Sequence, residues 1–210
     1  MQVEVWSDLV CPWCYIGKHR FAQALAEFPD RDQVHLVHRA FQLHPNALNT
    51  GQRVVEMIAE HYDIDPDQAL DMLSDEADTA AGEGLRVQMG EILVGNTAAA
   101  HRTVLWAQQH DPAAAARLLE GLFAGYFEAA AAIFIPADLV PFVQAAGLNP
   151  DAALLMLEGD EFSNHVHTDQ AEATRLGARG VPFVVIGDQP GIFGAEPVAV
   201  YLAALTAARR

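Results

Sequence analysis

The sequence predicts an α/β protein in which strand-forming segments at the two ends of the chain enclose a long helical block. Three observations support this fold class. A strand–helix–strand pattern occupies the first 41 residues, helical patterns dominate residues 45–160, and a strand–strand–helix pattern ends the chain. Apolar residues that alternate, or that form short runs, indicate the strands, and apolar residues spaced three or four apart indicate the helices.

The N-terminal segment predicts a βαβ unit. Residues 2–6 alternate in polarity and indicate a short strand. A helix is expected to begin near Cys11, because Pro12 in the first helical turn forfeits no helical hydrogen bond. Residues 34–41 indicate a second strand, and such a crossover is almost always right-handed. The helix face that would pack on the sheet consists of Cys14, Gly17, Phe21, Leu25 and Phe28.

The middle of the chain predicts helices almost throughout. Asp65 before Pro66 and Asp111 before Pro112 are typical of helix starts, because the aspartate side chain caps the first turn. Residues 90–95 fit either a short strand or a loop. The expected helices cover residues 52–62, 65 to the glycines at 82 and 84, 97–110, 112–128, 137–146 and a short segment from 150.

The C-terminal segment returns to the sheet. A helix over residues 161–176 leads to a short apolar run at residues 183–186, which is typical of a buried strand. An edge strand at residues 192–193 and a helix over 196–208 follow. We therefore assign residues 1–44 and 161–210 to a sheet-forming domain and residues 45–160 to a helical insertion domain.

The composition excludes several classes of function. Of the 210 residues 28 are acidic and 12 are basic, giving a net charge of −16 that disfavours nucleic acid as a partner. No apolar stretch is long enough to cross a membrane. The N-terminus lacks the basic and apolar segments of a secretory leader, so we expect a cytoplasmic protein with neither a nucleic-acid nor a membrane partner.

The two cysteines, Cys11 and Cys14, are the candidate catalytic residues. A disulfide between positions three apart closes almost no loop and stabilises little, so chemistry explains the pair better than structure. At a helix start, unpaired N–H groups and the helix dipole stabilise negative charge on the Cys11 sulfur. Cys14 lies one turn further on and on the same face. We therefore expect Cys11 to attack a disulfide and Cys14 to resolve the mixed disulfide.

Residues next to the cysteines have ordinary alternative roles. Lys18 fits a solvated lysine better than a source of charge at the site. Asp8 either accepts a proton or serves as a turn residue, which is the more frequent role of aspartate there. Trp13, at an exposed helix start, is expected to contact substrate. His101 is expected mainly to pack within the helical insertion.

Five segments of the chain, in order, resemble DsbA-like thioredoxin-fold proteins of the FrnE branch. The resemblance extends from residue 2 to about residue 204 and is most specific around the cysteines. The segments are Val5 to Lys18, Phe41 to Pro45, Asn96-Thr97 with Ala100 to Arg102, Gly180 to Phe183, and Gly194 to Pro197.

This resemblance implies a thioredoxin fold with a large all-helical insertion. It implies that Cys11 and Cys14 form a redox pair and that Pro182 is a cis-proline beside it. Pro12, Trp13, Val181 and Pro182 would then contact an extended substrate, which pairs with the backbone as an added strand does. The implied activity is that of a dithiol–disulfide oxidoreductase or isomerase without a cofactor. Its partners would be thiol- or disulfide-containing proteins, peptides or glutathione.

Three other functions stay open at this point. Cys-x-x-Cys is also half of a zinc site, which His35 or His38 would complete. The same fold branch contains glutathione-dependent kappa-type transferases and isomerases, although these use a single serine where this chain has Cys11. A non-enzymatic binding protein with a vestigial dithiol is the third. The direction of exchange is open as well, and a reducing cytosol favours reductase or isomerase work.

Overall fold

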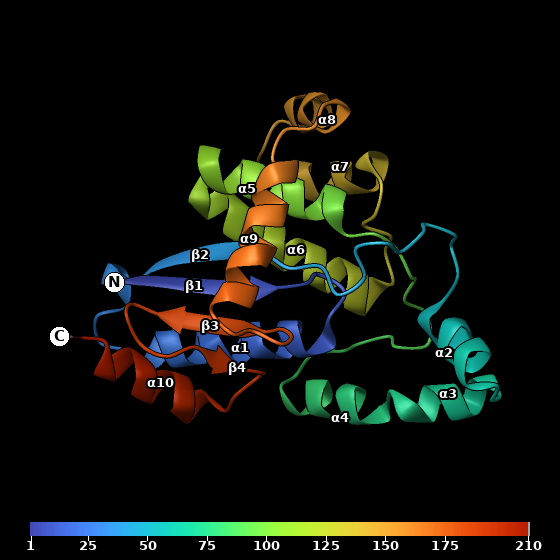
Figure 1. Ribbon diagram of the computed structural model, residues 1–210, viewed down its shortest axis with the longest axis horizontal. Helices are drawn as coiled ribbons and strands as arrows, with labels where there is room; N and C mark the ends of the chain where they lie inside the picture. Colours follow the sequence, from blue (N-terminus) through green and yellow to red (C-terminus); the bar gives the residue numbers. More distant parts are fainter. Residues whose placement is uncertain (210) are drawn as a thin grey trace. The chain divides into compact units, whose positions relative to one another are not determined.

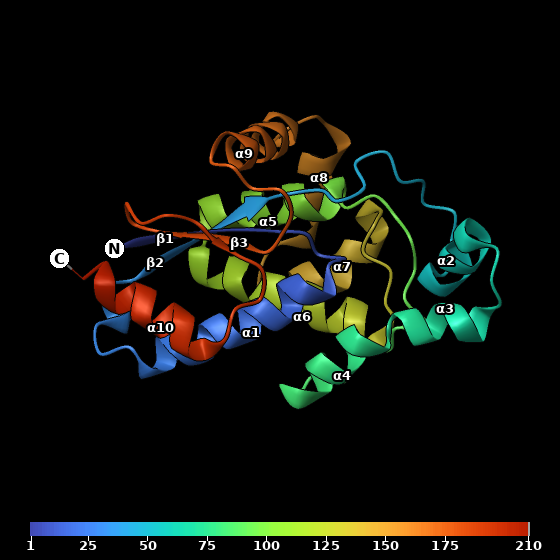
Figure 2. The same cartoon turned by 60° about the horizontal axis from the view of Figure 1, so that its bottom comes forward.

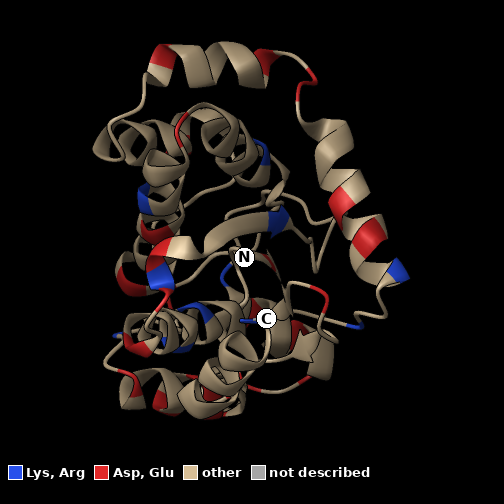
Figure 3. Ribbon diagram, turned by 90° about the vertical axis from the view of Figure 1, so that its left-hand side faces the viewer, with Lys and Arg blue, Asp and Glu red and all other residues tan. Residues whose placement is uncertain are grey.

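The computed structural model describes residues 1–209, which form two compact units. The sheet unit consists of Met1–Leu43 and the chain from Asn164 onward, and the helical unit consists of His44–Ser163. Within the described residues, no helix is both long and apolar enough to span a membrane. Acidic side chains outnumber basic ones along the ribbon (Figure 3).

The sheet unit is built on four strands in the order β2-β1-β3-β4. Strand β1 (Gln2–Ser7) pairs in parallel with β2 (His35–Ala40) and antiparallel with β3 (Phe183–Ile186), and β4 (Ile192–Phe193) pairs antiparallel with β3. This is the strand arrangement of a thioredoxin fold, as the resemblance implied. Strand β3 has the bounds that its apolar run predicts.

Helices cover both faces of this sheet. Helices α1 (Pro12–Glu27) and α10 (Val198–Ala207) pack together on one face, and α9 (Ser163–Arg175) lies on the other (Figures 1 and 2). The period of two along β1 explains both cores, since successive side chains point to opposite faces. One face contributes Val3 to a core with α1 and α10, and the other contributes Trp6 to a core with Ala173 and Phe183.

The helical unit contains seven helices within the described residues. The helices are α2 (Val54–Tyr62), α3 (Pro66–Met72), α4 (Ser74–Gly82), α5 (Ala98–His110), α6 (Pro112–Ala129), α7 (Pro136–Ala145) and α8 (Pro150–Glu158). Three of them, α3, α6 and α8, begin at an Asp-Pro or Asn-Pro pair, where Asp65, Asp111 or Asn149 accepts backbone N–H bonds and a proline follows.

Two expectations for the helical unit need correction or completion. The single helix expected from residue 65 is two helices, which break at Leu73. The Ser74 hydroxyl donates to the Asp71 carbonyl at 2.7 Å, a local bond that competes with a continuous helix. Residues 90–95 are a loop that contributes one isolated bridge, between Arg53 and Leu93.

A buried carboxylate on α9 ties that helix to the end of β2. Asp169 accepts the Ala40 N–H at 2.9 Å and a bond from Arg39 at 3.1 Å, while Arg39 also donates to Glu4 on β1 at 2.8 Å. Trp6 Nε1 donates to the Asp169 carbonyl at 2.8 Å. Asp169 is 5% exposed, so its partners exchange little with water. This cluster fixes α9 on β1 and β2.

We predict that Asp169→Ala lowers the free energy of unfolding by about 2 kcal/mol, because the buried Ala40 N–H loses its acceptor. Asp169→Asn keeps one acceptor oxygen and should lose less. Glu172→Gln, which removes an exposed ion pair with Arg175 on the same helix, is the control and should change little. Urea unfolding followed by circular dichroism measures all three. Equal stability of Asp169→Ala and the wild type would contradict the assigned role.

Candidate active site

Cys11 is the residue at which the loop after β1 becomes helix α1. It is the N-cap of α1 and has extended backbone angles (φ −92°, ψ 115°). Its carbonyl accepts bonds from the N–H groups of Cys14 at 3.0 Å and Tyr15 at 3.3 Å. Its side chain makes no capping bond, so the sulfur lies at the helix start without satisfying the N–H groups of the first turn. Pro12 occupies the first helical position, as expected.

Asp8 holds the loop in front of Cys11. Its carbonyl accepts the Cys11 N–H at 3.1 Å, and its side chain accepts the Leu43 N–H at 2.7 Å. The residue is fully buried. Asp8 therefore acts as a turn residue that also fastens the loop to the segment after β2. A role of its carboxylate in proton transfer stays a prediction.

Both cysteines are thiols in this structure, and both are buried. Cys11 is 4% exposed and Cys14 1% exposed. Burial raises the pKa of Cys14 well above the ordinary thiol value, and the hydrogen bond and charge of Cys11 raise it further. Cys14 is thus held as a neutral thiol at physiological pH, with the Cys11 sulfur next to it.

The Val181–Pro182 segment lies directly against Cys11. The peptide bond between these residues is cis, as the resemblance implied. The Cys11 thiol donates to the Val181 carbonyl, with 3.7 Å from sulfur to oxygen. Cys11 and Val181 are 170 residues apart in the sequence. Strand β3 begins at Phe183, directly after the proline.

Other residues singled out in the sequence lie on α1 and α5. Pro12 and Trp13 are half-buried in the first turn of α1, and Lys18 is half-buried one turn after Cys14. His101 is fully buried on α5 in the helical unit, where packing was its expected role. Within residues 1–209, no group of three or more His, Cys, Asp or Glu side chains is arranged to hold a metal ion.

Sequence reasoning missed three residues behind the site. A Cβ atom on Gly17 would lie 3.0 Å from Pro182 Cγ, so the glycine permits the close approach of α1 to this proline. Arg20 donates to the Ala195 carbonyl and Tyr201 to the Gly194 carbonyl. A glycine inside an apolar helix stripe is a recognisable signal of close approach. The other two contacts have carbonyl acceptors, which any residue supplies, and so leave no signal.

A known protein family and solved structures resemble this chain over nearly its whole length. The DSBA-like thioredoxin domain family matches residues 2–206. A probable DsbA oxidoreductase from Streptomyces coelicolor is 36% identical with a TM-score of 0.90, and the match covers 100% of this chain and 91% of that one. No curated protein matches the sequence.

More distant structures share the fold alone. A putative protein disulfide isomerase from Nitrosomonas europaea has a TM-score of 0.74 at 13% identity, covering 98% of this chain and 96% of that one. The cytosolic disulfide reductase DsbM from Pseudomonas aeruginosa, solved with GSH, has a TM-score of 0.66 at 16% identity, covering 100% and 96%. The chain therefore belongs to the DsbA-like thioredoxin-domain family, a family of thiol–disulfide oxidoreductases.

Proposed function

We propose that Cys11 and Cys14 are the redox pair of a protein-disulfide oxidoreductase, with Cys11 attacking and Cys14 resolving. The observation that carries this proposal is the place of the Cys11 sulfur. It lies at the start of α1 and 3.7 Å from the Val181 carbonyl, beside a cis-proline. A helix start stabilises a developing thiolate, and an adjacent extended backbone offers pairing to a substrate strand.

The exchange proceeds in two displacements. The Cys11 thiolate attacks one sulfur of a substrate disulfide, forming a Cys11–substrate bond and releasing the other substrate sulfur as a thiolate. Cys14 then loses its proton and attacks the Cys11 sulfur, forming the Cys11–Cys14 disulfide and releasing the second substrate sulfur. The substrate gains two electrons and two protons, and a dithiol or two glutathione molecules return them to the protein.

The raised pKa of Cys14 supports this order of the two steps. A thiol that stays protonated at neutral pH is a poor first nucleophile, because the thiolate is the attacking species. Once Cys11 is in a mixed disulfide, its charge no longer opposes ionisation of Cys14. Resolution then follows attack, and premature reaction of Cys14 is suppressed.

The Val181 carbonyl supports recognition of an extended peptide. In the dithiol form this oxygen accepts the Cys11 thiol. A mixed disulfide has no thiol hydrogen at Cys11, so the carbonyl becomes available to a substrate N–H. Pro12 and Trp13, half-buried in the adjoining helical turn, supply apolar contact for the substrate side chains.

The substrate class is inferred from the same site. Protein or peptide disulfides fit the backbone pairing, and glutathione fits as the returning thiol, in line with the GSH-bound disulfide reductase that shares this fold. A kappa-type transferase needs no resolving thiol, so Cys14 favours exchange. A cytoplasmic location stays a prediction, which cell fractionation tests.

We predict that Cys11→Ser lowers the rate of insulin reduction at least about a hundredfold, because a hydroxyl does not replace the attacking thiolate. Cys14→Ser should instead accumulate a covalent mixed disulfide between Cys11 and a peptide thiol, visible by mass spectrometry. Turnover by Cys11→Ser at the wild-type rate would refute the assignment. One equivalent of bound zinc in the purified protein would favour the metal-site alternative.

The direction of exchange depends on the reduction potential of the Cys11–Cys14 couple. We predict a value near or below the cytosolic glutathione poise of about −220 to −320 mV, which makes the protein a reductase or isomerase. Equilibration with glutathione buffers and trapping of the free thiols measure this potential. A value near about −120 mV would identify an oxidase instead.

We predict that the free energy of unfolding falls more steeply with pH in the wild type than in Cys14→Ala, between about pH 8.5 and pH 10. The unfolded state loses the Cys14 proton first, because the folded pKa is raised, so alkaline pH favours unfolding. The slopes should differ by up to about 1.4 kcal/mol per pH unit. Urea titrations at several pH values measure them, and parallel slopes would contradict the raised pKa.

A further inference from the structure

We propose that Arg20 and Tyr201 are positioning residues of the exchange site, because together they hold Gly194 and Ala195 against the Val181–Pro182 segment. We call Gly194–Glu196 the β4–α10 turn. The inference rests on the proposed function, and it assigns what fixes the substrate-pairing backbone relative to Cys11.

Three hydrogen bonds fasten this turn. The Gly194 N–H donates to the Pro182 carbonyl at 2.8 Å. The Tyr201 hydroxyl, from α10, donates to the Gly194 carbonyl at 3.0 Å, and Arg20 Nη1, from α1, donates to the Ala195 carbonyl at 2.6 Å. Side chains from two helices thus bind two adjacent carbonyls of the turn. The Gly194 N–H binds the proline carbonyl.

The turn and Pro182 also pack closely against α1, the helix that begins at Cys11. A Cβ atom built on Gly17 would lie 3.0 Å from Pro182 Cγ and 3.4 Å from Ala195 Cα. Helix α1 therefore touches both the proline and the turn less than one helical turn after Cys14. Gly194 has a φ of +79°, which a glycine adopts without strain, so the turn can bend toward α1.

The two side chains are constant donors. Tyr201 is fully buried and packs edge-on against Phe21, with ring centroids 5.5 Å apart. Burial raises the pKa of Tyr201 to about 12, so its hydroxyl keeps the donated proton at any pH where thiol exchange operates. The Arg20 guanidinium carries N–H donors and no acceptor, so it too serves a carbonyl only as a donor.

Loss of these contacts should weaken substrate pairing without changing the reactivity of Cys11. Val181, whose carbonyl contacts Cys11, directly precedes the proline that the β4–α10 turn supports. Releasing the turn frees Pro182, and the Val181 backbone then meets an extended substrate in several orientations. Binding of a long peptide disulfide weakens, whereas a small reagent that needs no backbone pairing reacts with Cys11 as before.

The test uses two variants and a matched control in the full chain. Arg20→Met and Tyr201→Phe each remove one bond to the turn and keep the apolar part of the side chain. Arg31→Met removes the same kind of bond, from Arg31 to the Ala26 carbonyl at 3.1 Å, at the opposite end of α1. The readouts are KM and kcat for a cysteine-linked peptide disulfide, the rate of alkylation by iodoacetamide, and hydrogen exchange of the Gly194 amide.

In both variants we expect KM to rise about five- to tenfold and the Gly194 amide to exchange about tenfold faster, because each variant loses one hydrogen bond. The kcat should change less than about twofold. Alkylation should stay within about twofold of the wild type, and Arg31→Met should match the wild type in every readout. The double variant should change KM by less than the product of the single effects, because both act on one turn.

Two results would overturn the inference while leaving the proposed function intact. One is wild-type KM and Gly194 exchange in both variants of an active protein. The other is altered alkylation in Arg20→Met that is restored in Arg20→Lys, with Tyr201→Phe unaffected, because Arg20 would then act through its charge. A wild-type protein that reduces no peptide disulfide would overturn the proposed function and this inference with it.

Discussion

The contact between the start of α1 and the Val181–Pro182 segment determines where the two sulfurs lie in the sheet unit. Cys11 lies where the helix begins, and its thiol meets the Val181 carbonyl at 3.7 Å. Each neighbouring element holds one side of this contact. Asp8 fastens the loop before Cys11, Gly17 allows α1 to approach the proline, and β3 extends from the proline into the centre of the sheet.

The two cysteines differ because their surroundings differ. Cys14 lies inside the first helical turn, where burial and the neighbouring sulfur keep it a thiol. Cys11 lies at the cap, against a backbone carbonyl and next to first-turn N–H groups that its side chain does not satisfy. Two cysteines three positions apart in the sequence thus have different surroundings, because one caps the helix and the other lies within its first turn.

Much of the fold could be predicted from the sequence because its signals are local. The apolar run at residues 183–186 and the capping residues Asp65, Asp111 and Asn149 each determine their own neighbourhood. The break at Leu73 was not predicted, although the Ser74–Asp71 bond beside it is also local, because serine occurs within helices as well as at their ends. The cysteine spacing is also a local signal and leads to the chemistry proposed for the pair, whereas the place of Val181 beside Cys11 came only from the family resemblance.

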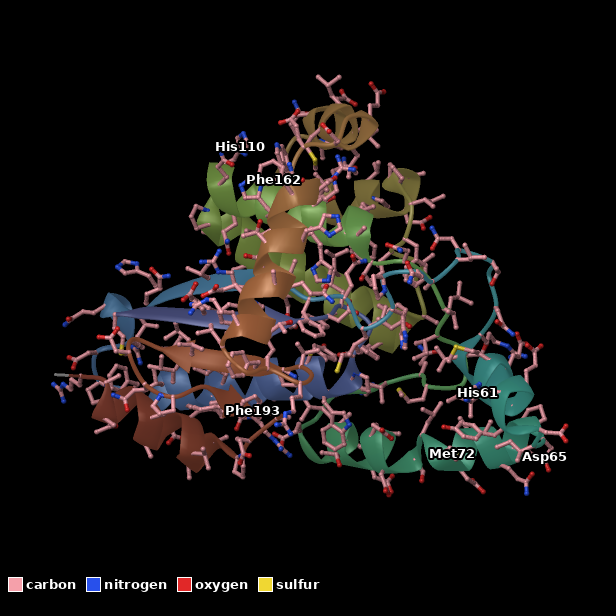
Figure 4. The ribbon with its side chains drawn as sticks, viewed as in Figure 1. His61, Asp65, Met72, His110, Phe162 and Phe193 are labelled. Carbon is pink, nitrogen blue, oxygen red and sulfur yellow. The ribbon has the colours of Figure 1, made fainter. Side chains whose placement is uncertain are left out.

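The contacts behind the site lie beyond local reasoning for a physical reason. Arg20 and Tyr201 bind carbonyl oxygens that every residue has, across sequence separations of 175 and 7 residues. Phe193, half-exposed on the edge strand and labelled in Figure 4, similarly shows its tilted ring contact with Phe183 only in the folded structure. Such contacts depend on how the strands and helices pack together, which the sequence pattern around either residue does not indicate.

The order of the strands has a consequence for how the chain is made. Strand β1 is central, yet one of its two neighbours in the sheet, β3, is synthesised about 180 residues later, as the pairing of Val3 with Ile186 shows. Pairings this distant close slowly, because the loop entropy is lost before the contact forms. During translation Cys11 and Cys14 thus leave the ribosome long before Val181, whose carbonyl contacts Cys11 in the folded chain, has been synthesised.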